Sequence, residues 1–102
     1  MEELIIYSPK GMPNVERYLN TELAKVKKRK IFSIDIKESG DIQVKLDKNI
    51  TNLKYFVRTV KKTEKGTQEI SNFLDKNKEA IKLSTLIKTL EYNSFFVLFF
   101  EK

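Results

Sequence analysis

The sequence predicts an α+β fold in which one βαββ unit occurs twice, giving six strands and two helices. Two observations lead to this prediction. Six short segments have the composition or the alternation of β-strands, and apolar residues recur at helical spacing in two others. These segments follow the same order in residues 1–50 and in residues 51–102. We expect the two units to form a single domain over 1–102, with the helices on one side of the sheet or sheets.

The first half predicts a strand, a helix and then two strands. ELIIYS at 3–8 is rich in isoleucine and predicts a strand that ends before Pro9. Pro13 and Asn14 suit the first turn of a helix, and apolar residues then follow at helical spacing as far as Val26. IFSIDIK at 31–37 and IQVKLD at 42–47 alternate with period two, and the turn SGD at 39–41 joins them.

The second half predicts the same order of elements. LKYFVRTV at 53–60 predicts a strand, the apolar residues of 70–81 give a helical face, and strands are predicted at 83–90 and 95–100. Lys-Gly precedes each helix, at 10–11 and 65–66, and the apolar helix positions match at the same spacing of 55 residues. In the following strands the best match has a spacing of about 51 and then 53. Chance similarity of two amphipathic helices does not explain the shared Lys-Gly, so we interpret the halves as a duplication.

The composition argues against catalysis. The chain has no Cys and no His, which excludes disulfides, thiolate zinc sites and the commonest general base and metal ligand. The acidic residues of the first hairpin are scattered through it rather than paired, as acid–base catalysis would need. We therefore expect a protein that is not an enzyme and that has no cofactor and no metal.

Charge and hydropathy indicate a cytoplasmic protein. The net charge is +6, from 20 basic and 14 acidic residues, and the two signs are mixed along most of the chain. Glu2 and Glu3 follow Met1, whereas a secretory signal begins with basic residues. The longest apolar run, 95–100, is too short for a membrane-spanning helix, so no membrane partner is expected.

The last predicted strand carries the candidate binding site. In the strand at 42–47 one face is apolar and the other is polar. At a spacing of 53, the polar positions Gln43, Lys45 and Asp47 match large apolar residues of the last strand. A face of this kind is typical of a protein or extended-peptide interface at the junction of the two units. The predicted partner-binding residues are Phe56, Leu86, Phe96, Leu98 and Phe100, with Lys54 and Arg58 as a polar rim.

Other interpretations of this apolar face stay open. One is that the strand is central and that the rest of the chain buries both of its faces. Another is that the face is the interface of a homodimer. The others are that the face lines a pocket for a small ligand, or that the alignment of the two halves is out of register.

A basic cluster suggests nucleic acid as an alternative partner. Its members are Lys25, Lys27, Lys28, Arg29 and Lys30. Clustered cations bind phosphates, but the C-terminus of a helix also favours cations.

The two Lys-Gly pairs are candidates for anion binding at a helix N-terminus, but they lack the spacing of a phosphate-binding loop. We interpret both Lys-Gly pairs as the entry turns of the two helices.

The opening MEELIIYSPKGMPNVERYLN, with a composition rich in Lys, Ile and Glu and free of His and Cys, resembles small proteins of Acidianus filamentous viruses. These viruses infect hyperthermophilic archaea. The resemblance covers the whole chain and implies a viral protein that acts in the host cytoplasm. It carries over no functional residues.

Overall fold

The computed structural model describes residues 2–7, 11–26, 28–50 and 53–102. Lys10 of the first Lys-Gly pair and Lys27 of the basic cluster lie outside these residues. The elements in chain order are β1 (Glu2–Ile6), α1 (Met12–Ala24), β2 (Arg29–Ile36), β3 (Ile42–Asn49), β4 (Tyr55–Lys61), α2 (Gln68–Lys76), α3 (Lys78–Ile81), β5 (Thr85–Glu91) and β6 (Phe95–Glu101). The α+β class and the six strands are confirmed.

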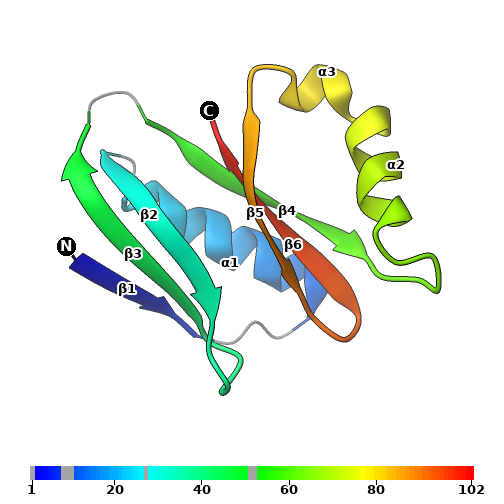
Figure 1. Ribbon diagram of the computed structural model, residues 1–102, viewed down its shortest axis with the longest axis horizontal. Coiled ribbons are helices and arrows are strands. Elements are labelled where there is room, and N and C mark those ends of the chain that lie inside the picture. Colours follow the sequence, from blue (N-terminus) through cyan, green and yellow to red (C-terminus); the bar gives the residue numbers. More distant parts are fainter. Residues whose placement is uncertain (1, 8–10, 27, 51–52) are drawn as a thin grey trace.

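The strands form two three-stranded antiparallel sheets with orders β1-β3-β2 and β4-β6-β5. In each sheet the first and second strands of that half flank the third, so the two halves have the same topology (Figure 1). In each half the helix follows the first strand and connects it to the second, which runs parallel to it on the other side of the third.

The two halves also share their local irregularities. A β-bulge at Phe32 interrupts the pairing of β2, and one at Ile87 interrupts that of β5, 55 positions later. Gly11 and Gly66 precede the helices with φ of 85° and 63°, a backbone conformation that other residues rarely adopt. The glycines of the two Lys-Gly pairs therefore lie at equivalent entry turns.

The two main helices lie on opposite faces of the second sheet. Val15, Leu19 and Leu23 of α1 share one core cluster with Phe95, Val97 and Phe99 of β6, among other residues. The alternate β6 residues, Phe96, Leu98 and Phe100, share a second cluster with α2 and α3. Figure 1 shows α1 behind the strands and α2 at the right of the view. The prediction that the helices lie on one side of the sheets is therefore wrong, because α1 packs against both sheets and covers the face of the second sheet opposite to α2.

The second predicted helix is divided into α2 and α3 at Asn77. The Asn77 backbone leaves helical geometry at φ −110° and ψ 17°, and its side-chain Nδ2 donates to the Phe73 carbonyl oxygen at 2.9 Å. Asparagine competes in this way for backbone hydrogen bonds, which favours the end of a helix. The break lets Ile81 join Phe73 over the second core cluster.

Candidate functional site

The predicted apolar face is buried inside the chain. Phe96, Leu98 and Phe100 are 3%, 0% and 1% exposed. Side chains of α2 and α3, including Ile70 and Phe73, pack over them. The prediction that these three residues bind a partner is wrong, because no partner reaches them in the folded chain. Burial within the chain, one of the alternatives, is what the structure shows.

The prediction failed through the alignment of the two halves. Ile42 pairs with Ile6 in the first sheet and lies under α1, whereas Phe96 pairs with Val60 in the second sheet and lies under α2. Ile42 therefore corresponds to Phe96, at a spacing of 54 residues, and not to Phe95. A shift of one residue exchanges the two faces of a strand. The face of β6 that α2 covers, with Phe96, Leu98 and Phe100, was consequently taken for the outward face.

Three other predicted residues, Lys54, Phe56 and Arg58, do lie together. They line a pocket of about 300 Å³ with Tyr55, Ala80 and Lys102. The Phe56 ring stacks on Phe100, with centroids 5.0 Å apart and an interplanar angle of 12°. The Arg58 guanidinium lies 5.2 Å from the centre of the Phe56 ring, and its Nη1 lies 3.3 Å from Oε1 of Glu16. The remaining predicted residue, Leu86, is partly buried against the second core cluster.

A second hollow lies where the two halves meet, between β2 and β5. Near the starts of these strands, Nζ of Lys30 lies 2.9 Å from Oε2 of Glu101, and the Ile31 N–H donates to the Tyr55 hydroxyl at 3.0 Å. Beyond their ends, the Tyr92 hydroxyl donates to the Gly40 carbonyl oxygen at 3.4 Å. β2 and β5 therefore run in the same direction, with the halves joined at both ends.

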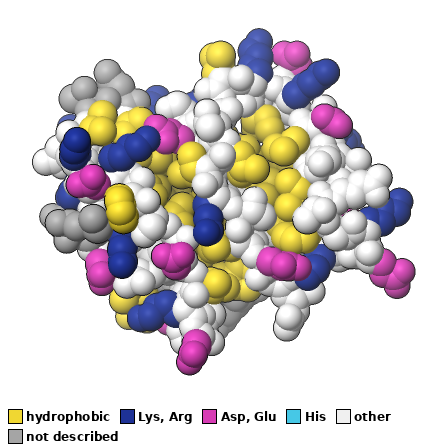
Figure 2. Space-filling model, viewed as in Figure 1, with side chains coloured by type: hydrophobic (Ala, Val, Ile, Leu, Met, Phe, Trp, Pro, Cys, Tyr) yellow, Lys and Arg dark blue, Asp and Glu magenta, His cyan; other side chains and the backbone are white. Residues whose placement is uncertain are grey.

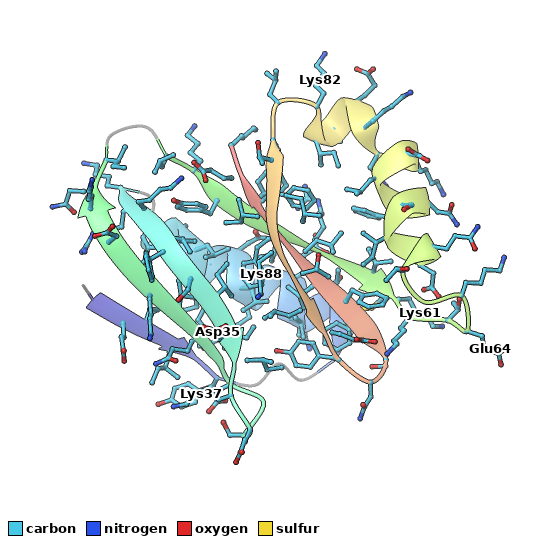
Figure 3. The ribbon with its side chains drawn as sticks, viewed as in Figure 1. Asp35, Lys37, Lys61, Glu64, Lys82 and Lys88 are labelled. Carbon is cyan, nitrogen blue, oxygen red and sulfur yellow. The ribbon has the colours of Figure 1, made fainter. Side chains whose placement is uncertain are left out.

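We call the hollow between these joins the junction cleft. It has a volume of about 240 Å³ and is lined by Ile31, Phe32, Ser33, Ile34, Asp35, Ile87 and Lys88. Asp35 and Lys88 lie at its mouth (Figure 3), and neither forms an ion pair with another described residue. Figure 2 shows apolar side chains gathered on both sides of β5. This cleft could not be predicted from alternation in the sequence, because the bulges at Phe32 and Ile87 disturb that alternation.

The basic cluster is largely occupied by contacts within the chain. Nζ of Lys25 lies 3.1 Å from Oε1 of Glu22, and Nη2 of Arg29 donates to the Asp47 carbonyl oxygen at 2.7 Å. The hydrogen bond to Glu101 raises the pKa of Lys30 above its ordinary value. Lys28 is exposed, and Lys27 lies outside the described residues. The described cations therefore end α1 and hold the start of β2, rather than forming one open phosphate-binding surface.

The chain matches no protein-family model, no curated protein and no solved structure. Within the described ranges, no three acidic side chains come close enough to hold a metal ion. The helices in those ranges are all too short or too polar to cross a membrane.

Proposed function

We propose that the protein is a non-enzymatic interaction module that binds an extended segment of a partner protein along the free edge of β5. The observation that carries this proposal is a difference in hydrogen bonding between the two edge strands of the second sheet. One edge, β4, is capped by α1, whereas no described residue forms a hydrogen bond with the outward backbone groups of Thr89 and Glu91 on the other edge, β5, which borders the junction cleft.

At the capped edge, side chains of α1 form hydrogen bonds with the outward backbone groups of β4. Asn20 Oδ1 accepts the Val57 N–H at 2.8 Å, and Glu16 Oε2 accepts the Thr59 N–H at 3.2 Å. An edge strand with unpaired backbone groups is a template for pairing with another chain, and proteins commonly cover such edges. The helix α1 thus removes β4 from that role.

The free edge of β5 offers backbone groups to a partner. The Tyr92 N–H donates to the Phe95 carbonyl oxygen at 2.9 Å, which sets the alternation of the β5–β6 ladder. By that alternation the backbone groups of Thr89 and Glu91 point away from β6. A bound extended peptide makes main-chain hydrogen bonds with groups of this kind.

Side chains on both faces of β5 favour a partner with alternating apolar residues. The junction cleft lies beside β5 on the side of β2, with Ile34 and Ile87 among its lining residues. On the face toward α2 lie Leu86 and the partly exposed apolar residues of α2. Successive side chains of an added strand point to opposite faces, so they contact the two apolar regions in turn.

The bulge at Ile87 and the charge of Lys88 narrow the choice of partner. Bulges and lysines on edge strands hinder pairing with arbitrary strands. The bulge at Ile87 leaves residues 88–91 of β5 for pairing with a partner strand. The charge of Lys88 favours a partner with an acidic residue at the position next to it. Given the resemblance to archaeal virus proteins, the proposed partner is a viral or host protein of the cytoplasm.

Selection from a random peptide display library tests this function. Thr89→Pro removes one outward N–H of β5, and Ile5→Pro is the matched control, because the same alternation points the Ile5 N–H away from β3. We expect the wild type and Ile5→Pro to select alternating apolar peptides, and Thr89→Pro to lose them. Slower hydrogen exchange at Thr89 and Glu91 on peptide binding provides a check that needs no substitution.

Two results would contradict the proposal. One is the absence of any peptide with micromolar affinity, and the other is protection at β1 instead of β5. Binding to random-sequence DNA that weakens steeply with salt, without peptide binding, would support the nucleic-acid alternative instead. A concentration-dependent dimer with protection at β5 would identify the partner strand as that of a second copy.

A further inference from the structure

The pocket beside β4 is lined by two lysines that lie opposite each other in the sheet. The Lys102 N–H donates to the Lys54 carbonyl oxygen at 2.8 Å, so the two residues lie directly across the β4–β6 ladder. Both line the pocket, and neither pairs with an acidic side chain among the residues that the structure describes. Like charges directly opposite each other in a sheet are destabilising.

The next pairs along the same ladder supply an aromatic surface and a third cation. Phe56 pairs with Phe100, and their rings are stacked. Arg58 pairs with Leu98 and lies over the Phe56 ring, while Ala80 of α3 lines the pocket from the other side. The six lining side chains thus include three cations and no carboxylate. Glu16 offsets part of the Arg58 charge only.

We propose that this pocket binds an anionic group, a phosphate monoester or a carboxylate, carried on an aromatic or aliphatic body. The anion relieves the repulsion between Lys54 and Lys102 and accepts charge-assisted hydrogen bonds from them. The apolar body contacts Phe56 and Ala80. A pocket volume of about 300 Å³ is at the lower end of the range for small-ligand sites. The site lies beside the capped edge of the sheet, so it is independent of peptide binding at β5.

An NMR titration with phenyl phosphate, benzoate and inorganic phosphate tests this site. The double variant Lys54→Gln, Lys102→Gln removes the facing lysines. Its matched control is Lys37→Gln, Lys61→Gln, which removes the same charge away from the pocket (Figure 3). For wild type and control we expect saturable shifts at the amides of Phe56 and Ala80. In the pocket variant, affinity should fall by roughly tenfold or more, as the loss of a charge-assisted hydrogen bond predicts.

The arms of the titration separate the two sources of anion and the part played by the apolar body. Tighter binding of phenyl phosphate than of benzoate identifies a phosphate ligand, and the reverse order identifies a carboxylate. Inorganic phosphate should bind more weakly than phenyl phosphate. Equal affinity in both double variants, or shifts that rise linearly over all lysines, would overturn the proposal. The pocket variant should melt no lower than wild type, since it loses a repulsive pair, so loss of binding cannot be mistaken for unfolding.

Discussion

Asn20 of α1 forms hydrogen bonds with both backbone groups of Val57 on the edge of β4. Its Oδ1 accepts the Val57 N–H at 2.8 Å, and its Nδ2 donates to the Val57 carbonyl oxygen at 3.3 Å. The side-chain amide thus satisfies the same pair of groups that a neighbouring strand would satisfy. Because α1 belongs to the first half and β4 to the second, this contact also fixes how the two halves pack.

Asn20→Ala should lower the free energy of unfolding by about 1–3 kcal/mol, because it leaves a partly buried N–H and carbonyl without partners. Asn72→Ala, at an exposed position of α2, is the matched control and should stay within about 0.5 kcal/mol of wild type. Urea unfolding measures both. Hydrogen exchange at Val57 should accelerate only in Asn20→Ala. Equal effects of the two substitutions would show that the cap contributes nothing.

Phe100→Ala should be severely destabilising, by about 3–5 kcal/mol, because it opens a cavity under α2 and removes the ring that stacks on Phe56. Phe32→Ala is the matched control, since Phe32 is 63% exposed. Its loss should cost about 0.5 kcal/mol or less. Urea unfolding compares the two. If Phe100→Ala were as stable as Phe32→Ala, the burial of this face within the chain would be wrong.

The order of elements could be predicted from the sequence because periodicity and turn residues are local signals. The alternation of 42–47 and the glycines at 11 and 66 identify strands and entry turns without any knowledge of tertiary contacts. The faces of the last strand could not be predicted in this way. Every residue from Phe95 to Phe100 is apolar, so the pattern contains no information about which set lies under a helix.

Of the two candidate sites, the pocket beside β4 was predicted in part from the sequence, whereas the junction cleft was not, for a related reason. Lys54, Phe56 and Arg58 alternate on one strand, so their common face follows from period two. Asp35 and Lys88 come from different sheets, and their approach depends on how α1 packs against both. No local pattern encodes that packing. The bulges at Phe32 and Ile87 would have given the correct alignment, but an extra residue in a strand is invisible without its partner strand.

The stability of the protein should fall at alkaline pH through Tyr55. Burial raises the pKa of Tyr55 above its ordinary value, and its hydroxyl accepts the Ile31 N–H. A pKa raised by folding means that the unfolded chain loses its proton first. The stabilisation is therefore complete below about pH 10 and is lost as the pH rises further. The raised pKa of Lys30 acts in the same direction.

Urea unfolding at about pH 8 and about pH 11 measures this loss. Tyr55→Phe should be less stable than wild type at the lower pH, by about 1–3 kcal/mol, because the buried Ile31 N–H loses its acceptor. It should also lose less stability between the two pH values. Tyr7→Phe is the control, since Tyr7 is 71% exposed. The same pH dependence in both variants would contradict a role for Tyr55.

Glu69 should hold α2 in place over the second core cluster. It is 9% exposed, and its Oε1 accepts the Thr63 N–H at 2.5 Å and the Thr63 hydroxyl. The carboxylate also lies in the first turn of α2, where the helix dipole favours negative charge. Glu69→Ala should cost about 1–3 kcal/mol, because the partly buried Thr63 N–H loses its partner. Glu69→Gln keeps an acceptor for Thr63 and should cost less.

Hydrogen exchange distinguishes this local role from a general loss of stability. In Glu69→Ala the amides of α2 should exchange faster relative to those of α1, because α2 contacts only the outer face of the second sheet whereas α1 packs against both sheets. Glu64→Ala, at an exposed position of the loop that precedes α2, is the control and should leave both helices unchanged. Equal acceleration in α1 and α2 would mean that Glu69 supports the whole fold rather than the docking of one helix.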